Sequence, residues 1–172
     1  MLHTFTVPVK PHVRKYLLHH LGGSYKLSRL DTFGRELKTL LEQKKTNNFL
    51  NGYTRCYTHV FGVSVEGNLI LQKRLKALNS KEIIDFNNFV ESIIKTEFHG
   101  FVANRRLFGL SQYGSIQAFR AKYDFQDEDI SHDTLKKSWQ RYKKDNPGAG
   151  GKRENSIKNA SVCPLPVGRL VA

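Results

Sequence analysis

The amino-acid sequence predicts an α+β protein with a small N-terminal antiparallel sheet and helices, a helical C-terminal part and a flexible basic tail. Near the start of the chain, apolar and polar residues alternate, as they do in a half-buried strand. From residue 79 onward, apolar residues recur at the spacing of helices. The last stretch is rich in glycine and proline and has no aromatic residue. We therefore expect an N-terminal α+β region over 1–78, a helical region over 79–146 and an extended or disordered tail over 147–172.

The alternating segment at residues 3–10 predicts the first strand. Pro8 favours an edge position, because proline has no N–H to donate to a neighbouring strand. Pro11 suits the first position of a helix, and Gly22 and Gly23 end that helix.

A short strand is expected within residues 24–30, followed by a helix over 31–45. Asp31 or Thr32 can cap this helix, because both side chains can accept a hydrogen bond from a backbone N–H of the first turn.

Residues 53–75 predict a hairpin of two strands connected at residues 66–68, although the second arm could instead be helical. One face of its first strand would carry three aromatic side chains: Tyr53, Tyr57 and Phe61. We expect this face to be buried as core, and a surface for stacking single-stranded bases is the rival interpretation.

The longest helical pattern covers residues 79–105. Asn79 and Glu82 have the spacing of a capping box, which fixes the beginning of the helix. Gly109 and Gly114 should bracket the loop that follows.

Two further helices are expected in the C-terminal part. Ser115 should cap the first, which reaches Tyr123, and Ser131 should cap the second. An acidic turn at residues 124–130 separates them, and we expect it to face away from any polyanion. The turn is longer than in a standard helix-turn-helix, so the pair is only similar to that motif.

The second of these helices, residues 132–144, is amphipathic. Leu135, Trp139 and Tyr142 lie on one stripe, which should anchor the helix to the core. Basic and amide side chains occupy the other positions.

Charge narrows the choice of partner. The chain has 28 lysine and arginine residues against 15 acidic residues, a formal net charge of +13 and a sequence pI of about 9.9. Such a balance is typical of proteins that bind nucleic acid, and an acidic protein partner or simple solubility are the alternatives. No apolar run is long enough to cross a bilayer, so we expect no membrane partner.

The expected nucleic-acid-binding residues lie on this basic helix and in the tail. They are His132, Lys136, Lys137, Gln140, Arg141, Lys143, Lys144, Lys152 and Arg153. Gln140 has the donor and acceptor pair that reads adenine, and Arg141 has the fork that reads guanine. The lysines would contact phosphates. A solvated surface or a protein-contact face are the alternative roles of the helix.

Sequence signals for catalysis are weak. The histidines and the two cysteines, Cys56 and Cys163, do not pair at zinc-finger spacing, and no phosphate-binding loop is present. We therefore expect no enzymatic activity, no catalytic residue, no metal site and no cofactor. The rival hypothesis is a metal-dependent nuclease or recombination protein that uses Asp127 and Asp129.

Two segments carry a resemblance to a known group of proteins. The segment FRAKYDFQDEDISHDTLKKSWQRYKK resembles the C-terminal, helix-turn-helix-like part of small DNA-binding proteins from bacterial phages and mobile elements. The opening FTVPVKPHVRKYLLHHLG is similar to their strand-then-helix start. Trp139 stands where those proteins often have tyrosine, and the long basic tail is a departure from them. The resemblance implies a DNA-associated role and no defined activity.

Together these observations predict a DNA-binding protein of a phage or mobile element, acting as a transcriptional regulator with helix 132–144 in the major groove. Its partner would be double-stranded DNA, and further copies of the chain or phage proteins are additional candidates. It would act in the cytoplasm of a bacterial host cell or in association with a virion. The alternative is a non-enzymatic component of a phage particle or nucleoprotein assembly.

Overall fold

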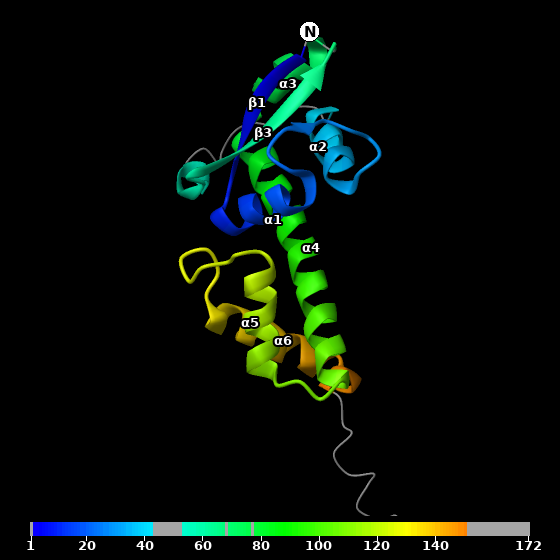
Figure 1. Ribbon diagram of the computed structural model, residues 1–172. Helices are drawn as coiled ribbons and strands as arrows, with labels where there is room; N and C mark the ends of the chain where they lie inside the picture. Colours follow the sequence, from blue (N-terminus) through cyan, green and yellow to red (C-terminus); the bar gives the residue numbers. More distant parts are fainter. Residues whose placement is uncertain (1, 43–52, 68, 77, 151–172) are drawn as a thin grey trace, which may run out of the picture.

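The computed structural model describes residues 2–42, 53–67, 69–76 and 78–150, and everything below refers to these ranges. The fold belongs to the predicted α+β class. A three-stranded sheet lies at one end, and one long helix runs from the sheet to a group of shorter helices at the other end (Figure 1).

The sheet has the order β1-β3-β2. Strands β1 (Leu2–Val9) and β3 (His59–Glu66) are antiparallel. Strand β2 (Tyr25–Lys26) pairs with β3 in parallel. The expected antiparallel pairing is therefore confirmed for β1 and β3 and wrong for β2, because an alternating pattern identifies a strand but not the direction of its neighbour. The edge position that Pro8 predicted for β1 is confirmed.

The predicted hairpin over residues 53–75 is also wrong. Its first residues form a short 3-10 helix, η1 (Tyr53–Cys56). Its second arm is helix α3 (Leu69–Lys76), which confirms the helical alternative for that arm. Strand β3 needs no hairpin partner, because β1 supplies its antiparallel neighbour from the start of the chain. Tyr53 lies in η1 and is exposed, whereas Phe61 lies in β3 and is buried, so the three aromatic side chains do not share one strand face. The expected burial is confirmed for Phe61 and wrong for Tyr53.

The helix boundaries follow the predicted caps with one exception. The Oδ1 atom of Asp31 accepts a hydrogen bond from the Gly34 N–H at 2.7 Å, at the start of α2 (Thr32–Glu42). The capping box is present at α4 (Ser80–Leu107), with both bonds between Asn79 and Glu82 at 2.8 Å.

The exception is α5 (Gln112–Lys122), which begins earlier than expected. Its cap is Ser111, whose Oγ accepts from the Gly114 N–H at 3.0 Å. Ser115 is instead fully buried in the first turns, where its hydroxyl donates to the Ser111 carbonyl at 2.8 Å. The sequence offers a serine at both positions, and either could cap a helix. Ser115 is buried inside the helix, so the cap is Ser111.

Helix α4 connects the sheet end to the helical end. Near its beginning, the fully buried Asn87 donates to the Pro8 carbonyl at 3.1 Å and accepts from the Lys10 N–H at 3.0 Å. These bonds fix α1 (Pro11–Leu21), which directly follows Lys10. Further along α4, Phe98 packs against Phe119 of α5 with ring centroids 5.2 Å apart. One hydrophobic cluster therefore includes residues from the sheet, from α1 and from the C-terminal helices.

The expected tail is partly ordered. Helix α6 (His132–Asp145) is followed by a short 3-10 helix, η2 (Pro147–Gly150), so an extended tail beginning at residue 147 is wrong for these four residues. Residues 151–172 lie outside the described residues. Among the helices that the structure describes, none combines the length and the apolar character that crossing a membrane would need.

We expect Trp139→Ala to lower the free energy of unfolding by about 3–5 kcal/mol, because the buried indole would leave a large cavity. Trp139→Phe should cost clearly less, because it keeps most of the buried apolar surface. Trp139 is the only tryptophan, so urea unfolding should be followed by circular dichroism instead of fluorescence. A loss below about 1 kcal/mol in Trp139→Ala would contradict the anchoring role.

Candidate nucleic-acid interface

Helix α6 has one buried face and one exposed face. Ser131 caps it by accepting from the Thr134 N–H at 3.2 Å, and Asp133 in the first turn is favourable to the helix dipole. Leu135 and Trp139 are buried in the core. The predicted anchoring stripe is confirmed, with Tyr142 half-buried at its end.

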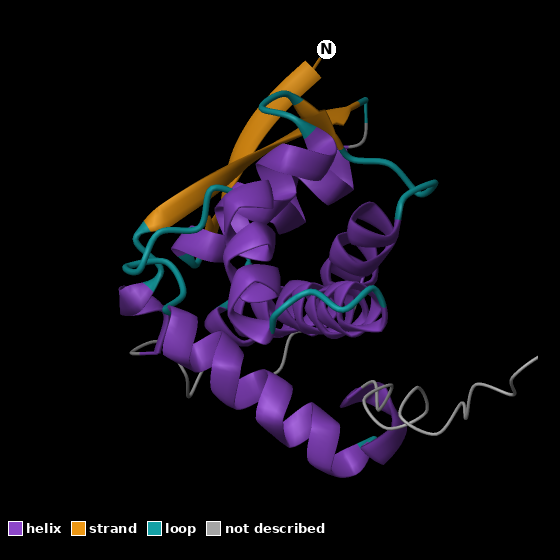
Figure 2. Ribbon diagram, turned by 60° about the horizontal axis from the view of Figure 1, so that its bottom comes forward, coloured by secondary structure: helices purple, strands orange, loops and turns teal. Residues whose placement is uncertain are grey.

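The opposite face of α6 is exposed along most of its length. In Figure 2, α6 is the helix that leads toward the grey tail, and it lies along the edge of the molecule. Five predicted interface residues are exposed on it: Lys136, Lys137, Gln140, Arg141 and Lys144. Asp133 and Asp145 are also exposed on α6 and place one negative charge near each end of the helix.

The remaining predicted residues have other positions. His132 is half-buried, and its ring lies 4.8 Å from the Tyr113 ring of α5, centroid to centroid. Its Nε2 atom is buried and has no hydrogen-bond partner among the described residues. Lys143 is half-buried on the flank of α6. The predicted tail contacts, Lys152 and Arg153, lie outside the described residues.

Six of the lysines and arginines that the structure describes outside α6 are paired with carboxylates. Four such pairs have a nitrogen-to-oxygen distance of 2.7 or 2.8 Å: Lys10–Glu91, Lys15–Asp129, Arg120–Asp127 and Lys122–Glu97. By contrast, the lysines and the arginine of α6 form no ion pair with any residue that the structure describes. The positive charge of α6 is therefore not neutralised within the described part of the chain.

The acidic turn between α5 and α6 contacts α1. Lys15 of α1 forms an ion pair with Asp129 and donates to the Asp124 carbonyl at 2.6 Å. Burial alone would raise the pKa of Asp129, but the hydrogen bonds from Lys15 and from the Gln126 N–H outweigh it and hold the pKa below its usual value. The turn also buries Phe125, so it is a folded connection instead of the tight turn of a standard helix-turn-helix.

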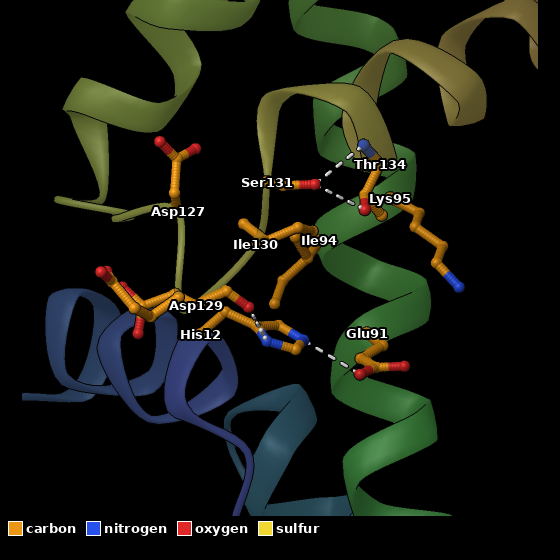
Figure 3. Close-up of a pocket in the computed structure, with 10 residues that line it drawn as sticks. His12, Glu91, Ile94, Lys95, Asp127, Asp129, Ile130, Ser131 and Thr134 are labelled. Carbon is orange, nitrogen blue, oxygen red and sulfur yellow. Dashed lines mark hydrogen bonds and ion pairs between the residues drawn. The ribbon is translucent and has the colours of Figure 1, made fainter.

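A cavity of about 400 Å³ lies between this turn and α4 (Figure 3). His12 bridges it, with Nε2 at 2.9 Å from Oε1 of Glu91 and Nδ1 at 3.1 Å from the Asp129 carbonyl. Burial opposes ionisation of Glu91, but hydrogen bonds from His12 and Lys10 lower its pKa to about 2. These contacts connect α1, α4 and the turn.

The rival nuclease hypothesis placed a metal ion on the acidic run from Asp127 to Asp129. Instead, Asp127 pairs with Arg120 and Asp129 pairs with Lys15. In the described ranges, no group of three or more histidine, cysteine or acidic side chains is arranged to hold a metal.

A second groove of about 400 Å³ separates α6 from α4 and brings in residues that sequence analysis did not select. Lys95 of α4 lines it together with Lys137 and Arg141, and in Figure 3 the Lys95 side chain extends away from the acidic turn. Lys95 and His99 are one turn apart on the polar side of the predicted long helix. This spacing was the feature of the sequence that could have identified them as a second basic surface. Asp145 also lines the groove, which therefore carries three cations and one acid and continues the positively charged surface from α6 onto α4.

His99 lies at the base of this groove and fixes α6 against α4. Its Nε2 atom is 3.0 Å from Oγ of Ser138, and its ring stacks on Tyr142 with centroids 4.3 Å apart. Burial lowers the pKa of His99, because the imidazolium would lose hydration there.

The chain matches no protein-family model, and comparisons with curated proteins and with solved structures also find no match.

We expect acid to weaken the attachment of α6. The pKa of His99 is lower in the folded state than its ordinary value of about 6.5, so the unfolded chain binds the proton first. The stability contribution is therefore fully present above about pH 6.5 and decreases as the pH falls below it, until the folded pKa is passed. Urea midpoints at about pH 7.5 and about pH 5.5 should show this loss.

His99→Gln provides the control, because glutamine can bond to Ser138 but does not titrate. It should lose less stability between the two pH values than the wild type. The His99→Gln variant should still lose some stability in acid, because burial also lowers the pKa of His20. An equal loss in both proteins would contradict the assignment to His99.

Proposed function

We propose that this protein binds double-stranded DNA through the exposed face of α6 and acts as a transcriptional regulator of a phage or mobile element. The observation that carries the proposal is the set of unneutralised cations on a helix whose other face is buried. The link to a phage or mobile element rests on the sequence resemblance alone.

Electrostatics supplies the first part of the mechanism. Duplex DNA carries about one negative charge per 1.7 Å of its axis, and each lysine that neutralises a phosphate releases a condensed counterion. Lys136, Lys137 and Lys144 are exposed and free of ion pairs with the described residues, so binding them to phosphate breaks no described ion pair. Lys95 can continue this phosphate contact onto α4.

Groove geometry supplies the second part. A helix of 14 residues is about 21 Å long, and the major groove, about 12 Å wide, accepts a helix of ordinary diameter. Gln140 and Arg141 lie in the middle of the exposed face, where they could reach adenine and guanine edges. Asp133 and Asp145, at the two ends of α6, would repel phosphate, which favours backbone contacts along the middle of the helix.

We expect Arg141→Ala to weaken binding to a preferred duplex, selected from a random pool, by about 1–3 kcal/mol while random duplex binding changes little. A binding titration on both duplexes measures the difference. An equal loss on both would mean that Arg141 contacts only the backbone. Wild-type protein that binds all duplexes alike would instead favour an assembly protein over a regulator.

We expect the double variant Lys137→Ala/Lys144→Ala to weaken binding to both duplexes and to reduce the slope of log affinity against log salt by about 2. The matched control is Lys81→Ala, an exposed lysine near the opposite end of α4, which removes one charge and should leave the slope unchanged. A slope that responds equally to Lys81→Ala would indicate a general charge effect instead of an interface on α6.

A further inference from the structure

Four large apolar side chains are exposed where α4 ends and α5 begins. We call them the apolar ridge: Leu107, Phe108, Leu110 and Tyr113. Phe108 is 79% exposed and Tyr113 is 64% exposed. Single exposed apolar residues are common, but four within seven positions indicate a contact surface.

The ridge is held on an ordered turn. Gly109 adopts a φ of +77°, a conformation that side-chain-bearing residues rarely take, and this lets the chain reverse after α4. The Leu110 N–H donates to the Arg105 carbonyl at 3.1 Å, and Nη1 of Arg106 donates to the Leu110 carbonyl at 3.1 Å. Because Ser111 then caps α5 directly, the turn has bonds on both sides, and Phe108 is presented in a defined position.

The ridge continues into the basic face of α6. The Tyr113 ring contacts the His132 ring at the first residue of α6, and Nε2 of Gln117 donates to the Tyr113 hydroxyl at 3.2 Å. Lys136 follows His132 one turn later on the same side of the helix. A ligand lying along α6 would therefore meet the ridge at the beginning of that helix.

The charge around the ridge selects the kind of ligand. Residues 98–123 contain no aspartate or glutamate, and Arg105 and Arg106, which directly precede the ridge at the end of α4, are positive. A second copy of the chain would bring the same positive charges and repel the first across the apolar contact. A nucleotide combines the flat apolar face of its base with a negative phosphate. It therefore suits both the exposed apolar side chains of the ridge and the positive charge beside them.

We propose that the apolar ridge is a base-stacking surface, on which Phe108, with Tyr113 beside it, receives unstacked or unpaired bases of the DNA held by α6. This inference rests on the proposed function. It adds that the protein should bind a distorted duplex more tightly than a regular one. Aromatic side chains that stack on bases contribute affinity with little dependence on sequence. Apolar residues that enter base steps also stabilise locally unstacked DNA.

The test compares a perfect duplex with the same duplex carrying one bulged 2-aminopurine, whose fluorescence reports its stacking. We expect wild-type protein to prefer the bulged duplex on the order of 10-fold and to change its fluorescence. Phe108→Ala should abolish the preference and the fluorescence change but keep binding to the perfect duplex. Because Phe108 is mostly exposed, the substitution should not unfold the protein, and circular dichroism checks this.

Two matched variants separate the parts of the interface. Phe108→Trp should retain the preference, because it keeps an aromatic surface. Lys137→Ala/Lys144→Ala should weaken binding to both duplexes by the same factor and leave their ratio unchanged. That combination would assign backbone capture to α6 and base stacking to the ridge.

Each failure has its own signature. Wild-type protein that binds no nucleic acid at low salt overturns both the proposed function and this inference. Binding that depends on α6 but shows no preference for the bulge, or an unchanged preference in Phe108→Ala, overturns only the inference. The inference is also overturned if Phe108→Ala leaves the preference intact while abolishing self-association, measured by light scattering, or binding to vesicles of anionic lipid.

Discussion

Burial of the Trp139 side chain is the interaction on which the candidate interface depends. A helix with several unneutralised cations on one face gains little stability alone, and an isolated helix of this length is marginal in water. The indole and Leu135 supply the apolar contact that attaches α6 to the core. His99 adds a polar contact at the same surface through Ser138. The basic side chains are therefore presented from a fixed helix, which reduces the ordering cost of binding.

The second constraint is the unequal distribution of carboxylates. Glu97 accepts hydrogen bonds from Tyr16, Tyr123 and Lys122, and Glu91 pairs with Lys10. These partly buried acids join α1, α4 and the end of α5. Since the acids are used there, the excess positive charge remains on the surface, where a polyanion would relieve its self-repulsion. The same distribution that stabilises the fold thus leaves the cations of α6 without ion pairs among the described residues.

The long connection between α5 and α6 follows from the same arrangement. A tight turn would pack the two helices only against each other. Here the chain first reaches α1, where Lys15 holds Asp129 and where His12 contacts the Asp129 carbonyl. The position of α6 is thereby coupled to the sheet end of the molecule through α1 and Asn87.

The sequence by itself determined the α+β class, the capping box at Asn79, the long helix α4 and the two faces of α6, because these depend on local spacing and on side-chain chemistry. The tertiary structure alone decided that β3 pairs with β1 and β2, since strand partners are chosen by long-range burial that periodicity does not encode. It also decided which cations are neutralised. Lys15 and Lys137 are equally basic in the sequence, but of these two only Lys15 forms an ion pair with a described carboxylate. Accessibility of the basic face and of the apolar ridge was likewise a product of packing, because exposure depends on which surfaces the other elements cover.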